Sequence, residues 1–88
     1  MDQEPQVITE ICEAILEGHR RILVVGASMQ FLTARTKPQI LDALQKRNLD
    51  CRQSPMPNQI IIGSDQLITL RLSKVETIKG FKGPVFQV

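Results

Sequence analysis

Four consecutive aliphatic residues, Ile22 to Val25, constrain most strongly what this chain can fold into. The run is short, rich in β-branched residues and free of any polar side chain that could face water. Such runs are typical of strands that are covered on both faces, usually in parallel sheets. Gly26, Ala27 and Ser28 follow and allow the chain to turn. We therefore expect residues 22–25 to form the buried central strand of a sheet.

The most regular helical pattern lies between Pro5 and Gly18. Proline fits the first turn of a helix and glycine fits the position just after its end. The acidic Asp2 and Glu4 suit the positive end of the helix dipole. Apolar residues at helical spacing form one stripe, which we expect to face the interior: Ile8, Ile11, Cys12, Ile15 and Leu16.

Residues 29–47 also have a helical pattern, but Pro38 interrupts it. Proline fits the first turn of a helix better than its interior, because it lacks an N–H group and its ring crowds the preceding turn. We therefore expect a short turn through Phe31 and Leu32, followed by a main helix from about Thr36. In that main helix, three residues are expected to face inward: Ile40, Leu41 and Leu44.

The sequence after residue 50 predicts strands separated by turns. The stretch CRQSPMPN, residues 51–58, carries two prolines that disfavour both helix and central strand, so we expect a connector. The stretch QIIIGSDQLITLRLS, residues 59–73, predicts two strands joined in a hairpin around Gly63. We expect a glycine-containing loop at IKGFKGP, residues 78–84, and a last strand at VFQV, residues 85–88.

The order of these elements predicts one α/β domain that spans residues 1–88. We expect a small sheet of about four strands, with a central parallel-type strand, two helices packed on it and a hairpin at one side. Cys12 and Cys51 lie on separate elements. We expect two reduced packing residues there, with a single disulfide as the alternative.

Charge is distributed unevenly along the chain, although the net charge is only +2. Residues 1–19 hold five acidic residues and no Lys or Arg, whereas residues 20–88 hold 11 basic and four acidic residues, a net charge of +7. This basic part could attract phosphate or an acidic partner. Alternatively, the acidic first helix offsets the basic remainder within the fold.

Neither a signal peptide nor a membrane span is expected. The N-terminal stretch MDQEPQVITE is acidic and lacks an apolar segment. No apolar run approaches the roughly 20 residues needed to cross a bilayer. The sequence therefore predicts a soluble protein of the cytoplasm.

Motifs of phosphate-binding enzymes are missing from the sequence. There is no GxxxxGK[ST] string, and VVGASMQF supplies only one of the glycines of a GxGxxG motif. Gly26 and Ser28 could still hold an anion or a nucleotide weakly, through free amides at a helix start. The alternative is a tight turn in which Ser28 caps the helix.

We expect no enzymatic activity, no cofactor and no metal site. His19 is the only histidine, and with two distant cysteines it cannot form a tetrahedral metal site. No nucleophile elbow surrounds any serine, and no pair of acids falls on a predictable common face. His19 is interpreted as a solvated residue at the end of a helix.

Six basic residues are candidates for contact with nucleic acid or with an acidic partner: Arg35, Lys37, Arg71, Lys74, Lys79 and Lys82. Lysines and exposed amides in a glycine-containing loop could hold a nucleic-acid backbone. Only Phe81 is available for base stacking in this region, so a platform for single strands is incomplete. The alternative is a solvated loop with Phe81 packed inward.

The layout resembles part of the ATPase core of phage large terminases and related helicase-like P-loop ATPases. The likeness covers roughly residues 6–88 and rests on RRILVVGAS, TARTKPQILDALQKR, QIIIGSDQLITLRLS, IKGFKGP and VFQV, in this order. In the family, a phosphate-binding loop precedes these elements and a pair of acidic residues follows the last strand. MDQEP contains no GKT or GKS, and the chain stops at Val88 before any acidic pair. The resemblance therefore implies a shortened, non-catalytic relative of viral origin that acts in an infected cell.

Three functions remain as hypotheses. The first is an interaction module that binds a protein partner, which the resemblance suggests is an ATPase or a host protein. The second is a nucleic-acid-binding protein that uses the basic residues, and the third is residual nucleotide binding at Gly26 to Ser28. Exposed strand edges also favour self-pairing, so a homodimer is a further expectation.

Overall fold

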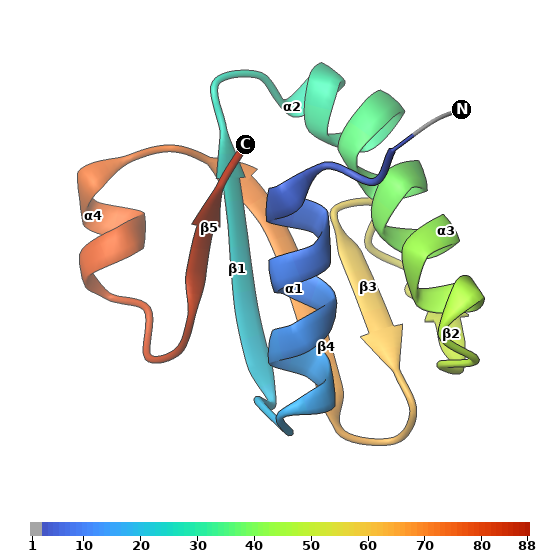
Figure 1. Ribbon diagram of the computed structural model, residues 1–88. Coiled ribbons are helices and arrows are strands. Elements are labelled where there is room, and N and C mark those ends of the chain that lie inside the picture. Colours follow the sequence, from blue (N-terminus) through green and yellow to red (C-terminus); the bar gives the residue numbers. More distant parts are fainter. Residues whose placement is uncertain (1–2) are drawn as a thin grey trace.

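The computed structural model describes residues 3–88 as a five-stranded mixed sheet with helices on its faces (Figure 1). Asp2 therefore lies outside the described residues. The elements follow in the order α1 Gln6–Leu16, β1 Arg21–Gly26, α2 Met29–Phe31, the π-helical turn η1 Leu32–Thr36, α3 Lys37–Lys46, β2 Cys51–Gln53, β3 Gln59–Ile62, β4 Gln66–Leu72, α4 Val75–Lys79 and β5 Val85–Gln87. The predicted α/β class is confirmed.

The strand order across the sheet is β2-β3-β4-β1-β5. β1 runs parallel to both of its neighbours, with Val24 opposite Leu70 of β4 on one side and Phe86 of β5 on the other. β3 pairs antiparallel with β4 and with β2. Ile22 to Val25 are at most 1% exposed. The prediction of a strand that is paired on both edges and covered on both faces is therefore confirmed.

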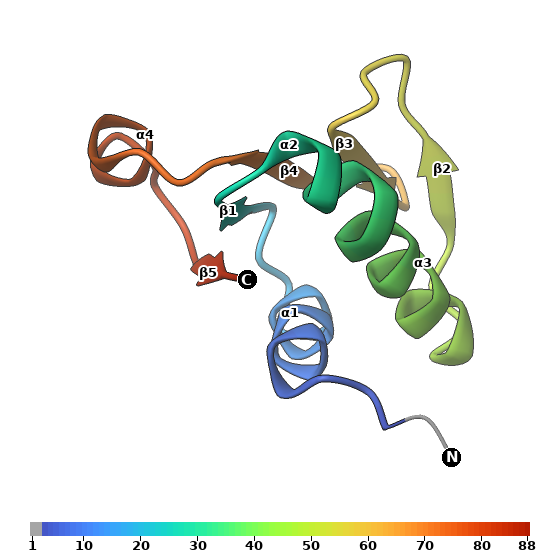
Figure 2. The same ribbon diagram turned by 90° about the horizontal axis from the view of Figure 1, so that it is seen from above.

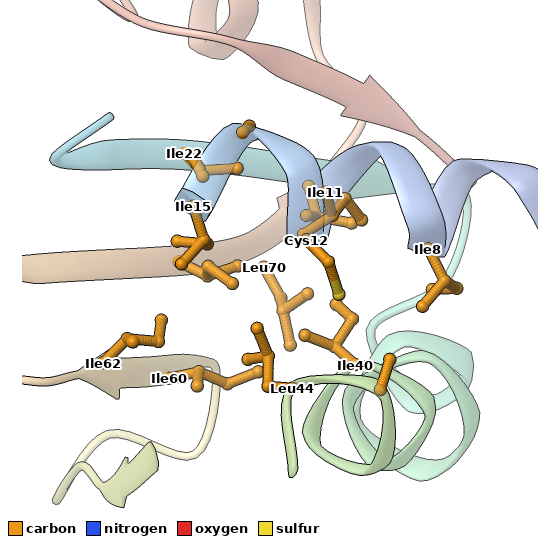
Figure 3. Close-up of a cluster of buried hydrophobic side chains, with 14 of the residues drawn as sticks. Ile8, Ile11, Cys12, Ile15, Ile22, Ile40, Leu44, Ile60, Ile62 and Leu70 are labelled. Carbon is orange, nitrogen blue, oxygen red and sulfur yellow. The ribbon is translucent and has the colours of Figure 1, made fainter. Parts of the chain in front are cut away.

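The two long helices, α1 and α3, lie together on one face of the sheet, whereas α4 lies on the other (Figure 2). Because successive side chains of a strand point to opposite faces of the sheet, Ile22 and Val24 of β1 point into the helical layer and Leu23 points to the opposite face. Figure 3 shows the aliphatic core between helices and sheet. Its residues include Ile8, Ile11, Cys12 and Ile15 of α1, Ile40 and Leu44 of α3, and Ile60, Ile62 and Leu70 of the hairpin.

The predicted boundaries of the first helix are confirmed. The carbonyl of Pro5 accepts the N–H groups of Ile8 and Thr9, so α1 begins directly after the proline. Gly18 has φ 95°, a conformation that glycine adopts without strain. The helix therefore ends where the sequence predicted.

The helix around Pro38 is continuous, which the sequence did not predict. Phe31, Thr36 and Lys37 all have right-handed helical backbone angles, so α2, η1 and α3 join without a break. The N–H of Lys37 donates to the carbonyl of Leu32, five residues back. This wider π-helical turn directly precedes Pro38 and accommodates the missing N–H and bulky ring of the proline.

The sequence prediction missed two short elements, β2 and α4. β2 lies in the expected connector and pairs with β3 through only three residues, and both prolines of that stretch come after it. α4 extends into the expected loop, because Ile78 and Lys79 belong to the helix, which has Glu76 in its first turn and Gly80 at its end. Such short elements carry too little periodicity to be recognised, so the sheet has five strands rather than about four.

Both cysteines are free thiols, and Cys12 is buried in the core, as predicted for a packing residue. Burial raises the pKa of both the Cys12 and the Cys51 thiol. These pKa shifts favour the protonated, unreactive form at neutral pH.

A bidentate ion pair joins the segment before α1 to the end of α3. The guanidinium of Arg47 donates to both carboxylate oxygens of Glu4, at 2.9 and 2.7 Å, and also to the carbonyl of Ala43 at 3.0 Å. Thr9 donates a further hydrogen bond to Glu4. The hydrogen bonds from Arg47 and Thr9 lower the pKa of Glu4 from 4.5 to about 2. Both side chains of the pair are about three-quarters buried.

We expect Arg47→Met to lower the free energy of unfolding by about 1–3 kcal/mol at neutral pH, because Glu4 loses its charged hydrogen-bond partner. The folded-state pKa of Glu4 is depressed, so its contribution is complete above about pH 4.5 and is lost as the pH falls towards about 2. Urea unfolding from pH 7 to pH 2 measures the difference between wild type and variant. The matched control is Lys46→Met, which breaks an exposed pair with Asp42 and should cost less than about 0.5 kcal/mol. A difference that stays constant down to pH 2 contradicts this role.

Candidate interaction surface on the second face of the sheet

The face of the sheet opposite α1 and α3 is covered only beside β1. Leu23 of β1 is buried there, and Phe81 lines the same cavity. Gly83 lets the loop after α4 lie close to the backbone of Arg21. Its φ is 149°, and a Cβ atom at this position would lie 2.6 Å from the carbonyl oxygen of Arg21. The loop after α4 therefore packs its backbone directly against the start of β1.

On the β3–β4 half of this face, α4 approaches only as far as a cavity that Glu76 and Thr77 line together with Gln59 and Thr69. Within residues 3–88, the cavity around Ile61 and Leu67 has no helical residue in its lining (Figure 2). Two cross-strand pairs occupy this half of the face: Ile61 lies opposite Leu67, and Gln59 lies opposite Thr69. All four side chains are half-buried. An apolar pair is therefore left at the surface of a sheet whose other face is fully packed.

Three cavities with shared lining residues follow one another along β4, and we call them together the β4 trough. The first, of about 420 Å³, shares Gln59 with the second, of about 480 Å³. The second shares Arg71 and Thr77 with the third, of about 220 Å³. The trough thus runs along the whole length of β4 and ends between α2 and α4.

Four basic residues line the β4 trough. Arg20 and Arg21 lie at its start, where Arg20 approaches Asp65 at 3.9 Å and Arg21 donates to the carbonyl of Asp65 at 3.4 Å. Arg71 and Lys74 lie at its far end. Arg71 and Lys74 are among the basic residues predicted from the sequence, whereas Arg20 and Arg21 are not. Both arginines directly precede the aliphatic run Ile22–Val25, and this position in the sequence is the signal that places them at the start of the buried strand.

The other four basic candidates lie outside the trough lining. Lys79 ends α4 and Lys82 follows it, both exposed. Arg35 is exposed on η1, and Lys37 donates to the carbonyl of Pro57 at 2.7 Å. The structure thus brings Arg71 and Lys74 together and spreads the remaining candidates along the helices and the loop.

Gly26 and Ser28 take part in packing and capping. A Cβ atom on Gly26 would lie 2.9 Å from a methyl carbon of Leu32, and the Gly26 carbonyl accepts the N–H of Ser73 at 2.9 Å. The hydroxyl of Ser28 accepts the N–H of Phe31 at 3.2 Å and caps α2. These contacts match the capping alternative, and anion binding at this turn stays a prediction.

Among the residues that the structure describes, the remaining ionisable groups form no cluster of metal ligands. His19 is exposed and lies 3.6 Å from the carboxylate of Glu17. In residues 3–88 there is no group of three or more His, Cys, Asp and Glu side chains close enough to hold a metal ion. Within the same residues, no helix has the length and apolar character that crossing a membrane requires.

Comparison of the chain with protein-family models, with curated proteins and with solved structures finds no match. The resemblance to terminase and helicase-like ATPases therefore stays a prediction, and function must be inferred from the surface itself.

We expect Ser28→Ala to lower the free energy of unfolding by about 1 kcal/mol, because α2 loses its N-terminal cap. Ser28→Asp keeps an oxygen acceptor at this position and should retain most of that stability. Urea unfolding with and without added phosphate measures both effects. Stabilisation of the wild type by phosphate that disappears in Ser28→Ala would instead support the anion site.

Proposed function

We propose that this protein is a non-catalytic interaction module that binds a partner protein through the β4 trough. The observation that carries the proposal is the half-covered sheet: the second face is packed beside β1 and left open over β3 and β4. The open half displays the apolar pair Ile61 and Leu67 beside amide and hydroxyl groups. Protein–protein interfaces combine apolar contacts with hydrogen bonds, and this surface offers an apolar pair beside side chains that can form hydrogen bonds.

A nucleic-acid-binding protein is the second candidate, and one observation favours it. Arg20, Arg21, Arg71 and Lys74 lie along one trough, against the two acids Asp65 and Glu76. Basic side chains spaced along a groove can neutralise a phosphate backbone. Protein binding remains the first choice because single strands need aromatic platforms, and Phe81 is the only aromatic side chain in the trough lining.

The test is affinity capture from a cell lysate with the wild-type chain and with Leu67→Glu as bait, before and after nuclease treatment. Leu67 is half-buried on the open side, so the substitution places a charge in the trough without opening the core. We expect a protein that the wild type retains after nuclease treatment, and whose recovery falls about tenfold or more with Leu67→Glu.

The matched control is Leu16→Glu in α1, in the other layer of the fold. Leu16 was expected to face the interior, but it is 60% exposed. This variant should retain the partner at the wild-type level. Retention that disappears after nuclease treatment supports the nucleic-acid candidate instead. Equal recovery with Leu67→Glu and Leu16→Glu contradicts a role for the β4 trough.

Self-association is a separate proposal that concerns the edges of the sheet. β2 and β5 form the two edges, and each has three residues. Unpaired backbone groups on an edge strand can pair with a second copy. Light scattering at high protein concentration tests for a homodimer, and a strict monomer rules it out.

A further inference from the structure

Large apolar side chains gather at one end of the sheet. Four such side chains are exposed in residues 3–88, and three of them lie where β1 and β4 end and β3 begins: Phe31 at 51%, Met56 at 52% and Val75 at 68% exposure. Phe31 is in α2, which follows β1, Val75 begins α4, which follows β4, and Met56 precedes β3. Because β3 is antiparallel to β4, its start lies beside the end of β4. We call this end of the molecule the α2–α4 end.

A cavity of about 220 Å³ opens at the α2–α4 end, and its lining includes Met29, Asn58 and Lys74, which lie one or two residues along the chain from Phe31, Met56 and Val75. Met29 of α2 forms one wall and Lys74 and Thr77 form the other, with the last residues of β4 between them. The remaining lining residues are Asn58, Leu70, Arg71 and Leu72. The apolar side chains of Met29, Leu70 and Leu72 share this lining with polar and charged ones. A cavity of this size suits one bulky apolar side chain, such as the anchor of a bound peptide.

Hydrogen bonds hold the segments around the cavity in place. Lys37 binds the carbonyl of Pro57, and the hydroxyl of Ser54 accepts the N–H of Met56 at 3.1 Å, so the loop before β3 is fixed. The amide of Asn58 donates to the carbonyl of Leu70 at 3.1 Å. The N–H of Ser73 binds the carbonyl of Gly26, which fixes the approach to α4. A pre-formed apolar surface loses little entropy when it binds a partner.

The charge around the α2–α4 end is positive. Arg71 and Lys74 line the cavity, and Arg35 and Lys37 lie on the helix that continues from α2. Glu76, in the first turn of α4, is the acidic residue of the elements that border the cavity. The partner segment should therefore carry carboxylates beside its apolar anchor.

We infer that the α2–α4 end binds an acidic segment of a partner protein, whose bulky apolar side chain enters the cavity between Met29 and Lys74. This inference rests on the proposed interaction function and names the chemistry of the partner. Carboxylates of the segment pair with Arg71 and Lys74, and its flanking apolar residues contact Phe31, Met56 and Val75. Methionine suits such a surface because its flexible thioether adapts to different side chains.

The same features favour a peptide over a nucleic acid. Met56 and Val75 have no planar face on which a base could stack, and Phe31 is the one aromatic side chain among the exposed apolar residues of this end. An electrostatic backbone site needs no exposed aliphatic groups. The exposed apolar side chains and the neighbouring basic residues of this end therefore fit an acidic peptide with apolar side chains better than a nucleic acid.

The experiment uses NMR of the full chain labelled uniformly with ¹⁵N and with ¹³C-methyl methionine, whose methyl signals are assigned through Met29→Leu and Met56→Leu. The probe is a short synthetic peptide of Glu and Asp with Leu at every third or fourth position. Control peptides replace Leu by Ser or Glu by Gln. We expect saturable shifts of the Met29 and Met56 methyl signals that weaken with salt and vanish with the Ser control. The amide of Gly18, at the other end of β1, should not shift.

A pair of matched double variants tests the charged contacts. Arg71→Gln with Lys74→Gln should weaken peptide binding about fivefold or more. Lys79→Gln with Lys82→Gln removes the same charge at the other end of α4 and should leave the affinity unchanged.

Three results would overturn the inference. The first is the absence of methyl shifts up to the solubility limit of the acidic peptide. The second is a shift confined to the amides of Ile61 and Leu67, which leaves the proposed trough function standing. The third is a shift of Met29 and Met56 with single-stranded oligothymidylate but not with the peptide. The capture experiment with Leu67→Glu is independent of all three, so failure of the partner chemistry is distinguishable from failure of the proposed function.

Discussion

The fold depends on covering Ile22 to Val25 from every direction. This strand has no polar side chain to present to water, so each of its faces and edges needs a neighbour. β4 and β5 pair with its edges, α1 and α3 cover Ile22 and Val24, and Phe81 with the loop after α4 closes over Leu23. The ion pair between Glu4 and Arg47 then ties the segment before α1 to the end of α3.

The proposed interaction surface follows from how far this cover extends. The helical layer spans the sheet from β1 to the β3–β4 hairpin, but the cover on the second face is a five-residue helix and a loop, which pack beside β1 and border a cavity with Gln59 and Thr69. Beyond them, Ile61 and Leu67 remain at the surface beside basic residues. Within residues 3–88, the second face therefore lacks the layer of long helices that covers the first. Binding a partner would supply the missing cover.

Strong periodicity made much of the fold predictable. The apolar stripe of α1, the aliphatic run of β1 and the paired strands around Gly63 each identified an element from sequence, because burial imposes the pattern directly. β2 and α4 have no apolar pattern that would reveal them in the sequence. β2 is stabilised by pairing with β3, and α4 by the residues at its two ends. In the candidate site, Arg71 and Lys74 were foreseen from charge alone. The trough that joins them to Arg20 depends on strand order, which no local pattern contains.

Native-state hydrogen exchange tests the central claim most directly. If Ile22 to Val25 is the covered strand on which the whole fold depends, its amide N–H groups exchange only through global unfolding. The free energies of exchange of Leu23, Val24 and Val25 should then equal the free energy of unfolding from urea titration, while those of α4 should be lower. Exchange of β1 through local opening, at free energies as low as those of α4, would contradict the account.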